Sequence, residues 1–368
     1  MRIIHVIGTL GFGGAQSLLV DLASSQKLLG HDVSVIELSN ACASIFRKPL
    51  LEKGITIHAV SNSSVYSIKH IIRVSNYIKS ADIVHVHLFP ALYWVALSKK
   101  FFGGNYKLLY TEHSTHNKRR GARLWRFLDK WIYQSYDRIV ACSDSAKSSF
   151  DEAFPTLCCL SIPNGINLTK FKNAQPYDKS ALWGVAENTR VSTMVARFEY
   201  PKRQEVIVKA LKELPDKFHC ALVGGTEGQQ GIEKVKKIAE DEGVLDRVHF
   251  MYTRSDVPQI LKSSDFIILS SDFEGLSLSM LEGMSVGKPF IASEAPGLSD
   301  VVAGSGILFS PGDAHALASV LRELDENVTR YEEVAKLCAQ KADEYDINNV
   351  AQKYIEVYEQ VLNNKYDG

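Results

Sequence analysis

Short apolar runs alternate with amphipathic stretches along the whole chain. In the first part the apolar runs are Arg2–Ile7, Val33–Glu37, Ile55–Val60, Ile83–His87, Leu108–Thr111 and Arg138–Ala141, and the amphipathic stretches include Ala15–Leu29 and Ile68–Ile78. Continuous apolar runs separated by helical patterns are typical of a parallel sheet covered by helices. The pattern therefore predicts an α/β fold of the Rossmann-like, doubly wound type.

The alternation breaks into turn residues near positions 162–167 and then restarts. Later strands are predicted at Arg190–Val195, His219–Val223, Val248–Met251, Phe266–Leu269 and Pro289–Ala292, and helices at Arg203–Leu211, Ile232–Glu242, Val257–Leu261, Leu276–Val286 and Ala314–Leu324. A last amphipathic stretch, Ile347–Leu362, predicts a closing helix. Since 368 residues suit two domains, we expect domains at 1–165 and 166–345, facing a cleft, with 346–368 crossing back to the first.

Composition indicates a soluble globular protein, with 45% apolar and 23% charged residues. No stretch approaches the roughly 18 apolar residues of a membrane span, and the six cysteines lack metal-ligand spacing, so a cytoplasmic protein with reduced thiols is expected. Residues 1–165 hold 19 Lys and Arg against 11 Asp and Glu, which leaves 23 against 31 in the remainder. The basic first half suits phosphate-bearing substrates or anionic lipid, unless it is only an uneven surface.

A glycine-rich loop, Gly8 to Gln16, follows the first predicted strand and opens a helix. Glycines there let backbone amides approach an anion, and the helix start adds a positive dipole. The loop resembles the dinucleotide fingerprint, but Gln16 replaces the third glycine and no P-loop lysine follows. Gly14 and its neighbours are therefore either a phosphate or acceptor loop or a structural tight turn.

Histidines end two of the predicted strands of the first half. His113 follows Leu108–Thr111, at the edge where ligands of such sheets bind, and its imidazole can bond a hydroxyl or a phosphate. His85 and His87 share one face of an earlier strand, but no nearby cysteine or carboxylate completes a metal site. Each of the three is also consistent with a structural role.

A predicted helix after this edge combines aromatic and cationic side chains. Leu124, Phe127, Leu128 and Trp131 form an apolar stripe at helical spacing. Beside the stripe or just before it lie Trp125 and the cations Arg119, Arg120, Arg123, Arg126 and Lys130. The pattern fits an interfacial helix on anionic lipid and equally a core helix with a solvated face.

Arg197 and Lys202 are the cations of interest in the second half. Arg197 follows a strand and Lys202 precedes a helix, so together they could hold a diphosphate without a metal, Arg as a fork and Lys as a point charge. The sequence contains no Asp-x-Asp pair that could carry magnesium or manganese against phosphates. We therefore expect no metal and no resident cofactor.

The most informative segment runs from Glu274 to Glu282. Glu274 stands in the loop after a strand, and Gly275, Leu276 and Ser277 are expected to begin a helix whose free amides can face an anion or a sugar hydroxyl. Glu282 lies about two turns on, roughly 12 Å at 1.5 Å per residue. The two carboxylates could thus contact the two ends of one elongated ligand, although a helix cap and a surface residue would look similar.

These motifs together resemble family 4 of the GT-B glycosyltransferases. The resemblance covers nearly the whole chain through Gly13-Gly14-Ala15-Gln16, Arg197 with Lys202, Glu274-Gly275 with Glu282, Gly287-Lys288-Pro289 and Pro311-Gly312-Asp313. It implies two Rossmann-like domains, the first binding the acceptor and the second a nucleotide-sugar donor. Two departures are Gly283, where alanine is usual, and Pro296-Gly297, where a glycine pair is common.

The resemblance also implies roles for residues. Arg197 and Lys202 would bind the donor diphosphate, Glu274 the transferred sugar and Glu282 the ribose, while His113 would approach the donor sugar. The backbone near Gly224 and from Tyr252 to Arg254 would frame the base. Transfer of a hexose or N-acetylhexosamine would retain the anomeric configuration, through a front-face exchange or through a covalent adduct on Glu274.

The resemblance favours a UDP-sugar donor and a glycan or lipid-linked glycan acceptor of polysaccharide or glycolipid synthesis. The protein would be cytoplasmic, with an anionic membrane surface as an additional partner on the inner face of the cell membrane, and nucleic acid is not expected as a partner. Two other classes remain as alternatives: a nucleotide-sugar-binding protein without turnover, and an NAD-dependent oxidoreductase in which Glu37 binds the ribose.

Overall fold

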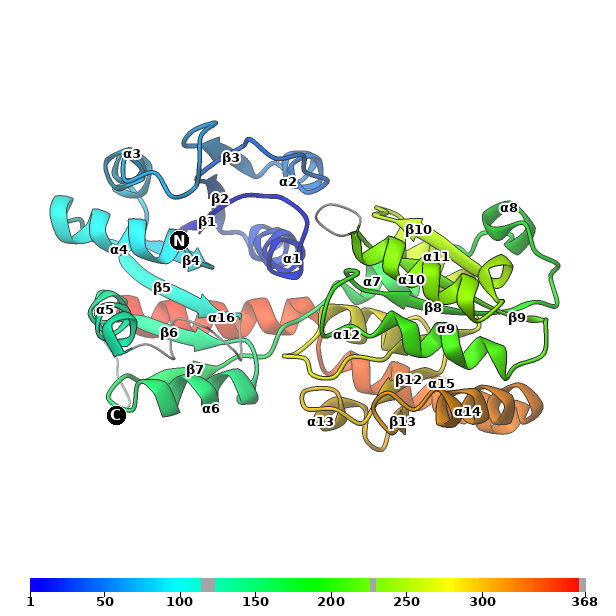
Figure 1. Ribbon diagram of the computed structural model, residues 1–368. Helices are drawn as coiled ribbons and strands as arrows, with labels where there is room; N and C mark the ends of the chain where they lie inside the picture. The colour runs from blue at the N-terminus through cyan, green and yellow to red at the C-terminus, as the bar shows by residue number, and fades with distance from the viewer. Residues whose placement is uncertain (114–122, 226–229, 364–368) are drawn as a thin grey trace. The chain divides into compact units, whose positions relative to one another are not determined.

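The computed structural model describes residues 1–113, 123–225 and 230–363. The chain folds into two compact units (Figure 1). Unit 1 comprises Met1–Ile166 together with Ile347–Gly368, and unit 2 comprises Asn167–Asp346. Each unit is built around its own parallel sheet.

Unit 1 contains a seven-stranded sheet in the order β3-β2-β1-β4-β5-β6-β7. Its strands are β1 (Arg2–Ile7), β2 (Asp32–Glu37), β3 (Thr56–Ala59), β4 (Ile83–His87), β5 (Lys107–Glu112), β6 (Arg138–Ala141) and β7 (Cys159–Ser161). Its helices are α1 (Gly14–Leu28), α2 (Arg47–Glu52), α3 (His70–Ile78), α4 (Ala91–Phe102), α5 (Arg123–Tyr133), α6 (Asp144–Ala153) and α16 (Ile347–Leu362). The strand order reverses direction between β1 and β4, which is the topological switch point of this sheet.

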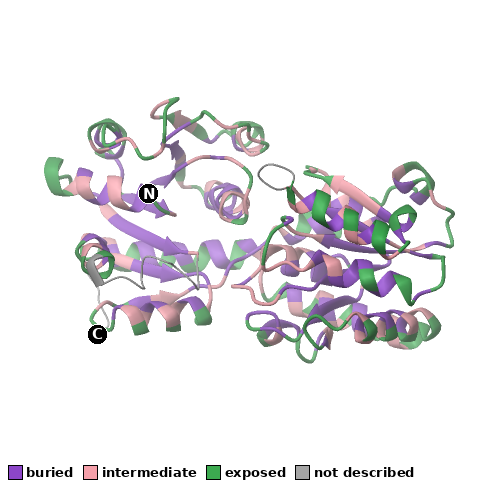
Figure 2. Ribbon diagram, viewed as in Figure 1, coloured by how far each residue is buried: buried purple, intermediate pink, exposed green. Residues whose placement is uncertain are grey.

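The two faces of this sheet are covered by different helices. Apolar side chains of alternate strand residues, among them Val6, Val86 and Tyr110, pack in one core with α3, α4, α5 and α6. Residues on the opposite face meet α1 and α16, which also pack on each other. The last helix of the chain therefore belongs to unit 1. Figure 2 shows the strands of unit 1 as buried along most of their length.

Unit 2 contains a six-stranded sheet in the order β10-β9-β8-β11-β12-β13, with its switch point between β8 and β11. Its strands are β8 (Arg190–Val195), β9 (Phe218–Val223), β10 (Val248–Tyr252), β11 (Phe266–Leu269), β12 (Phe290–Ser293) and β13 (Ile307–Phe309). Its helices are α7 (Leu168–Lys172), α8 (Lys179–Trp183), α9 (Gln204–Lys212), α10 (Gln230–Asp241), η2 (Leu245–Arg247), α11 (Val257–Ser263), α12 (Leu278–Ser285), α13 (Ser299–Val302), α14 (Ala314–Glu326) and α15 (Val328–Asp343).

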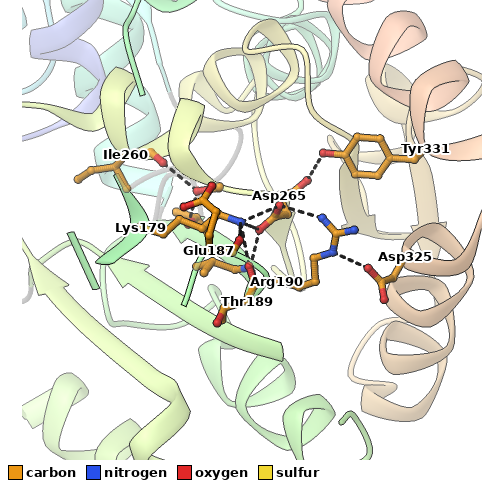
Figure 3. Close-up of polar contacts among 11 residues, drawn as sticks. Lys179, Glu187, Thr189, Arg190, Ile260, Asp265, Asp325 and Tyr331 are labelled. Atoms are coloured by element: carbon orange, nitrogen blue, oxygen red, sulfur yellow. Dashed lines mark hydrogen bonds and ion pairs between the residues drawn. The ribbon is translucent and has the colours of Figure 1, made fainter. Parts of the chain in front are cut away.

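A buried polar cluster anchors β11 to its surroundings (Figure 3). Asp265, which precedes β11, accepts hydrogen bonds from Lys179 Nζ at 2.9 Å and 3.1 Å and from the Val191 backbone at 2.8 Å. The Tyr331 hydroxyl of α15 donates to the Asp265 carbonyl at 2.8 Å. Since Lys179 and Asp265 are both nearly buried, this pair depends on its full set of partners.

The predicted elements agree with the observed ones to within one or two residues in most cases. One shift bears on the site, and several observed elements, among them β7, β13 and α15, have no counterpart among the predicted ranges. The helix expected from Leu276 begins only at Leu278, so residues 275–277 are non-helical and precede it. Helix α15 was not predicted, because its exposed positions carry many charges and its buried residues, such as Val334 and Cys338, are few. Among the described residues, no helix is both long and apolar enough to span a bilayer.

Candidate functional site

The loops that follow β8 and β11 meet at the switch point of the six-stranded sheet. Lys202, after β8, and Glu274, after β11, form an ion pair with 2.5 Å between Nζ and Oε1. The same carboxylate oxygen accepts a hydrogen bond from the Ser271 hydroxyl at 2.5 Å. Both side chains are largely buried, with 14% of Lys202 and 10% of Glu274 exposed. The structure thus brings together two predicted residues that are 72 positions apart.

The backbone holds both partners in place. Ser270, at the end of β11, donates its hydroxyl to the carbonyl oxygens of Lys202 at 3.1 Å and Arg203 at 2.9 Å. The Glu274 amide donates to the Pro296 carbonyl at 2.9 Å. Arg203 adopts a left-handed conformation and its guanidinium contacts both oxygens of Asp272. Loops from three parts of the unit are therefore fixed to one another around the ion pair.

Gly297 explains how the Glu274 loop fits. It has a φ of +79°, and a Cβ at this position would lie 2.2 Å from the Glu274 carbonyl oxygen. A side chain here would push the loop away, so only glycine allows this approach. The Pro296-Gly297 pair therefore still supplies one glycine where the family often has two.

Arg197 is placed differently from Lys202. Its side chain is 71% exposed and its guanidinium contacts Glu199 at 2.5 Å. Gln204, the first residue of α9, donates to the Arg197 carbonyl at 2.8 Å and so fixes the backbone of the loop. The guanidinium stays accessible to an anionic ligand at the carboxyl edge of the sheet, and an exposed pair with Glu199 costs little to exchange for a phosphate.

The start of α12 corrects one expectation about the site. Ser277 is the N-cap of the helix, and its hydroxyl contacts Ser279 at 3.0 Å instead of capping a backbone amide. The first-turn amides are therefore not taken by a side-chain cap. Gly275 and Leu276 lie before the helix and do not belong to its first turn.

Glu282 lies within α12 and is partly exposed. The next residue, Gly283, is buried, and a Cβ there would lie 2.7 Å from Ile267 and 2.9 Å from Phe290. Glycine at this position lets α12 approach the strands beneath it closely, which gives a packing reason for the departure from alanine.

The loops after β9 and β10 contain the remaining predicted residues of this unit. The Gly224 amide donates to the Tyr252 carbonyl at 2.8 Å, and a Cβ on Gly224 would lie only 2.0 Å from the Ala196 carbonyl oxygen. Tyr252 has a positive φ and is 47% exposed. Arg254 forms a two-pronged contact with Asp256, at 2.8 Å and 2.6 Å, which lowers the pKa of that carboxyl. The neighbouring residues 226–229 lie outside the described part of the chain.

In unit 1 the glycine-rich loop leads directly into the N-terminus of α1. Gly13 is the N-cap of α1, and Gly14 is its first residue. A Cβ on Gly13 would lie 2.4 Å from the Gln16 amide oxygen. Glu37 is buried, and both its oxygens receive the Arg47 guanidinium at 2.8 Å, while the Leu10 amide contacts it at 3.3 Å. Since this carboxylate already has its partners, the ribose role of an NAD-dependent oxidoreductase is unsupported.

His113 lies at the carboxyl end of β5 and is only partly exposed. Its Nε2 lies 3.3 Å from Nδ1 of His87, and burial lowers the pKa of His113 to about 4. His87, His85 and His5 are all buried, and a ligand atom from each lies within 4.8 Å of the others. The sequence pattern indicated His85 and His87 of β4 but not His5 of β1. His5 lies beside His85 because the β1–β4 register pairs the two residues.

Helix α5 exposes both of its tryptophans and Phe127. Phe127 is 70% exposed, Trp125 45% and Trp131 43%, whereas Asp129, Ile132 and Tyr133 face the core. Phe127 and Trp131 therefore lie on the solvated side of α5, while the helix packs on the core through Ile132 and Tyr133, so a core helix with a solvated face and an interfacial helix both remain open. A groove of about 200 Å³ at Phe127 is lined by Arg126, Phe127, Lys130, Ala153, Phe154, Pro155 and Thr156. Arg119 and Arg120 lie outside the described residues, as does the side chain of Arg123.

Comparison with known proteins identifies the fold and the family. The description "Glycosyltransferase Family 4" matches residues 12–170, and "Glycosyl transferases group 1" matches residues 178–342. The structure of Anabaena HepE in complex with UDP and glucose is similar, with a TM-score of 0.85 at 21% identity, over 98% of this chain and 99% of that one.

Two similar proteins carry specific names. The N,N'-diacetylbacillosaminyl-diphospho-undecaprenol alpha-1,3-N-acetylgalactosaminyltransferase of Campylobacter jejuni is 28% identical over 206 residues, 54% of each protein. The GDP-mannose:cellobiosyl-diphosphopolyprenol alpha-mannosyltransferase of Komagataeibacter xylinus is 25% identical, over 98% of this chain and 94% of that protein. With both domain types matched in order along one chain of this fold, the protein belongs to family 4 of the GT-B glycosyltransferases.

Proposed function

We propose that the protein transfers a hexose or N-acetylhexosamine from a UDP-sugar to a sugar or lipid-linked sugar acceptor. The observation that carries this proposal is the Lys202–Glu274 pair at the switch point of unit 2. A cation, a sugar-bonding carboxylate and uncapped helix amides stand at one sheet edge, as an elongated anionic sugar donor requires. The UDP complex of HepE supports uridine, and the named relatives support a diphospho-lipid-linked acceptor.

In this proposal Arg197 and Lys202 contact the donor diphosphate and stabilise the charge that develops on it as the glycosidic bond breaks. The leaving diphosphate takes the acceptor's proton on the same face, so the anomeric configuration is retained without a protein base. Glu282 bonds the ribose, and the backbone at Gly224 and from Tyr252 to Arg254 frames the base. His113 approaches the transferred sugar.

The contacts of Glu274 suit the role of a hydrogen-bond acceptor better than that of a nucleophile. Its Oε1 already receives Lys202 and Ser271, each at 2.5 Å. Two such donors stabilise the carboxylate and lower its tendency to attack. Mass spectrometry of the enzyme with a slow fluorinated donor tests this assignment, since a glycosyl adduct on Glu274 would require the double-displacement route instead.

Metal independence is part of the proposal, because Arg197 and Lys202 can supply the positive charge that a divalent ion provides elsewhere. Turnover in excess EDTA should equal turnover in added magnesium or manganese. Loss of activity in EDTA, with recovery on adding one of these ions, would show that the two cations do not suffice.

The central experiment is a donor screen. The protein is incubated with uridine, guanosine and adenosine diphosphate sugars, with and without a lipid-linked sugar acceptor, and released nucleotide is measured. Acceptor-dependent release of UDP is expected. Binding of a UDP-sugar without release under any condition would indicate a sensor, and release from only a guanosine or adenosine donor would correct the base.

We further propose that α5 places unit 1 on an anionic membrane surface. Exposed Trp125, Phe127 and Trp131 beside Arg126 and Lys130 provide aromatic insertion and charge attraction together. The wild-type protein should co-sediment with vesicles containing phosphatidylglycerol, and the F127S/W131S variant should not. The control variant K172A, which replaces an exposed lysine of unit 2, should bind as the wild type does. Equal sedimentation of all three proteins at low salt would refute this role.

A further inference from the structure

A row of polar side chains crosses the α1/α16 face of the unit 1 sheet. The register pairs His5 of β1 with His85 of β4, and His87 with Thr111 of β5. Alternate strand residues share a face, so His5, His85, His87 and Thr111 all point to the same side, and His113 continues the row beyond β5. Gln26 of α1 and Tyr358 of α16, the helices that cover this face, contact the row.

These side chains form a continuous hydrogen-bonded chain that ends at His113. Gln26 Oε1 lies 2.7 Å from His5 Nε2, and His5 Nδ1 lies 3.0 Å from His87 Nε2. His87 Nδ1 then lies 3.3 Å from His113 Nε2. Gln26, His5 and His87 are each essentially buried, so water does not compete for these bonds.

A side branch uses the other end of the glutamine. Gln26 Nε2 donates to the Tyr358 hydroxyl at 3.2 Å, and that hydroxyl lies 2.7 Å from His85 Nδ1. His85 Nε2 contacts the Thr111 hydroxyl at 2.7 Å. Both ring nitrogens of His5, His85 and His87 are therefore engaged by protein groups, and a cation among them would have to break these bonds without a carboxylate to balance its charge.

The chain has a direction. Burial lowers the pKa of His5 to about 4 and that of His87 well below its usual value, so each neutral ring carries one N–H at neutral pH. Because the glutamine oxygen accepts, His5 must donate from Nε2 and accept at Nδ1. His87 then donates from Nε2 and accepts at Nδ1, which requires His113 to donate from Nε2.

We propose that Gln26, His5 and His87 are positioning residues that hold His113 as the Nε2–H tautomer, with the lone pair of Nδ1 directed to accept a hydrogen bond from a hydroxyl of the transferred sugar. Among the described residues, none forms a hydrogen bond with that Nδ1 atom. The identity of the ligand rests on the proposed function, whereas the tautomer rests on the hydrogen-bonded chain alone.

Nitrogen-15 NMR of the full-length protein labelled at histidine tests the tautomer directly, since two-bond correlations distinguish a protonated from an unprotonated ring nitrogen. We expect Nε2 protonated and Nδ1 unprotonated in both His87 and His113 at pH 7. If the Gln26 amide were rotated, every donor in the chain would be reversed and His113 would be protonated at Nδ1. Observation of that tautomer would overturn the proposal.

Two variants connect the tautomer to turnover. Gln26→Leu removes the terminal acceptor, and we expect mixed tautomers at His113 with a kcat about tenfold lower and a donor KM changed less than about twofold. Tyr354→Phe removes a similarly buried hydroxyl that contacts Thr111 at 3.1 Å and lies outside the chain to His113. This control should keep both tautomer and kcat.

Equal behaviour of the two variants, or an unchanged His113 tautomer in folded Gln26→Leu, would refute the positioning role. If no donor supports transfer, the wild-type NMR result still decides the tautomer, so failure of the proposed function and failure of the positioning role are distinguishable.

Discussion

At the scale of single residues, we expect Lys202 to interact with two negatively charged groups. It neutralises a largely buried carboxylate, and in the proposed mechanism it also faces the donor diphosphate. Lys202→Ala should therefore lower kcat by about 10²–10³, the usual cost of losing a transition-state charge donor. Arg197→Ala should lower kcat to a comparable degree without affecting folding, because its side chain is exposed.

Nucleotide-release kinetics on purified variants measures these effects. Lys212→Ala is the matched control, since Lys212 pairs with Glu242 on the surface at 2.8 Å. Near-normal turnover in both the Lys202 and the Arg197 variants would remove the diphosphate role from these residues.

Gly297 offers a second test at this scale. Gly297 and Gly304 have φ values of +79° and +77°, so alanine costs each about 1–2 kcal/mol of backbone strain. Only at Gly297 would the new Cβ also strike the Glu274 carbonyl, at 2.2 Å, whereas nothing lies within 4 Å at Gly304. We expect Gly297→Ala to lower kcat/KM about 100-fold by displacing Glu274. Similar kcat/KM in the two alanine variants would show that this contact does not matter.

At the scale of elements, one buried ion pair joins α8 to the residue that precedes β11 (Figure 3). Lys179→Met would leave the Asp265 carboxylate without its main counter-charge and should lower the free energy of unfolding by about 3–5 kcal/mol. Lys172→Met breaks an exposed pair with Asp343 and should cost less than about 1 kcal/mol. Urea denaturation compares the two, and equal midpoints would contradict the anchoring role.

Helix α5 shows which element properties can be derived from sequence. Its existence and its aromatic–cationic composition follow from residue spacing. Which face is buried does not, because Asp129 lies in the core and accepts a hydrogen bond from the Tyr93 hydroxyl. A hydrophobic pattern alone assigns a carboxylate to the solvent side, and only the partly buried Tyr93 hydroxyl of α4 reverses that choice.

At the scale of the whole molecule, buried histidines make stability depend on pH. The folded-state pKa of His5 is lowered to about 4 from 6.5, with His85 and His87 also well below 6.5. As pH falls below 6.5 the unfolded chain takes up protons first, so stability present at neutral pH is progressively lost toward pH 4. For His5, whose pKa falls from 6.5 to about 4, the loss at pH 5 should be about 2 kcal/mol, and His85 and His87 should add to it in the same direction.

Urea midpoints at pH 7 and pH 5 measure this loss, in a range where carboxyl groups of ordinary pKa stay mostly ionised. His5→Phe should reduce the difference between the two midpoints. An unchanged wild-type midpoint from pH 7 to pH 5 would mean that these histidines are not neutral in the folded protein.

The sequence by itself determined the α/β class, most element positions, the family and the residue types at the carboxyl edge of the unit 2 sheet. These follow from local periodicity and from motifs whose spacing is read along the chain. Only the tertiary structure decided that Lys202 pairs with Glu274, that Gly297 makes room for that loop and that Glu37 is taken by Arg47. It also decided that His5, His87 and His113 form one chain. The physical reason is that hydrogen bonds and ion pairs act over about 3 Å, and strand order and register determine which distant residues come that close.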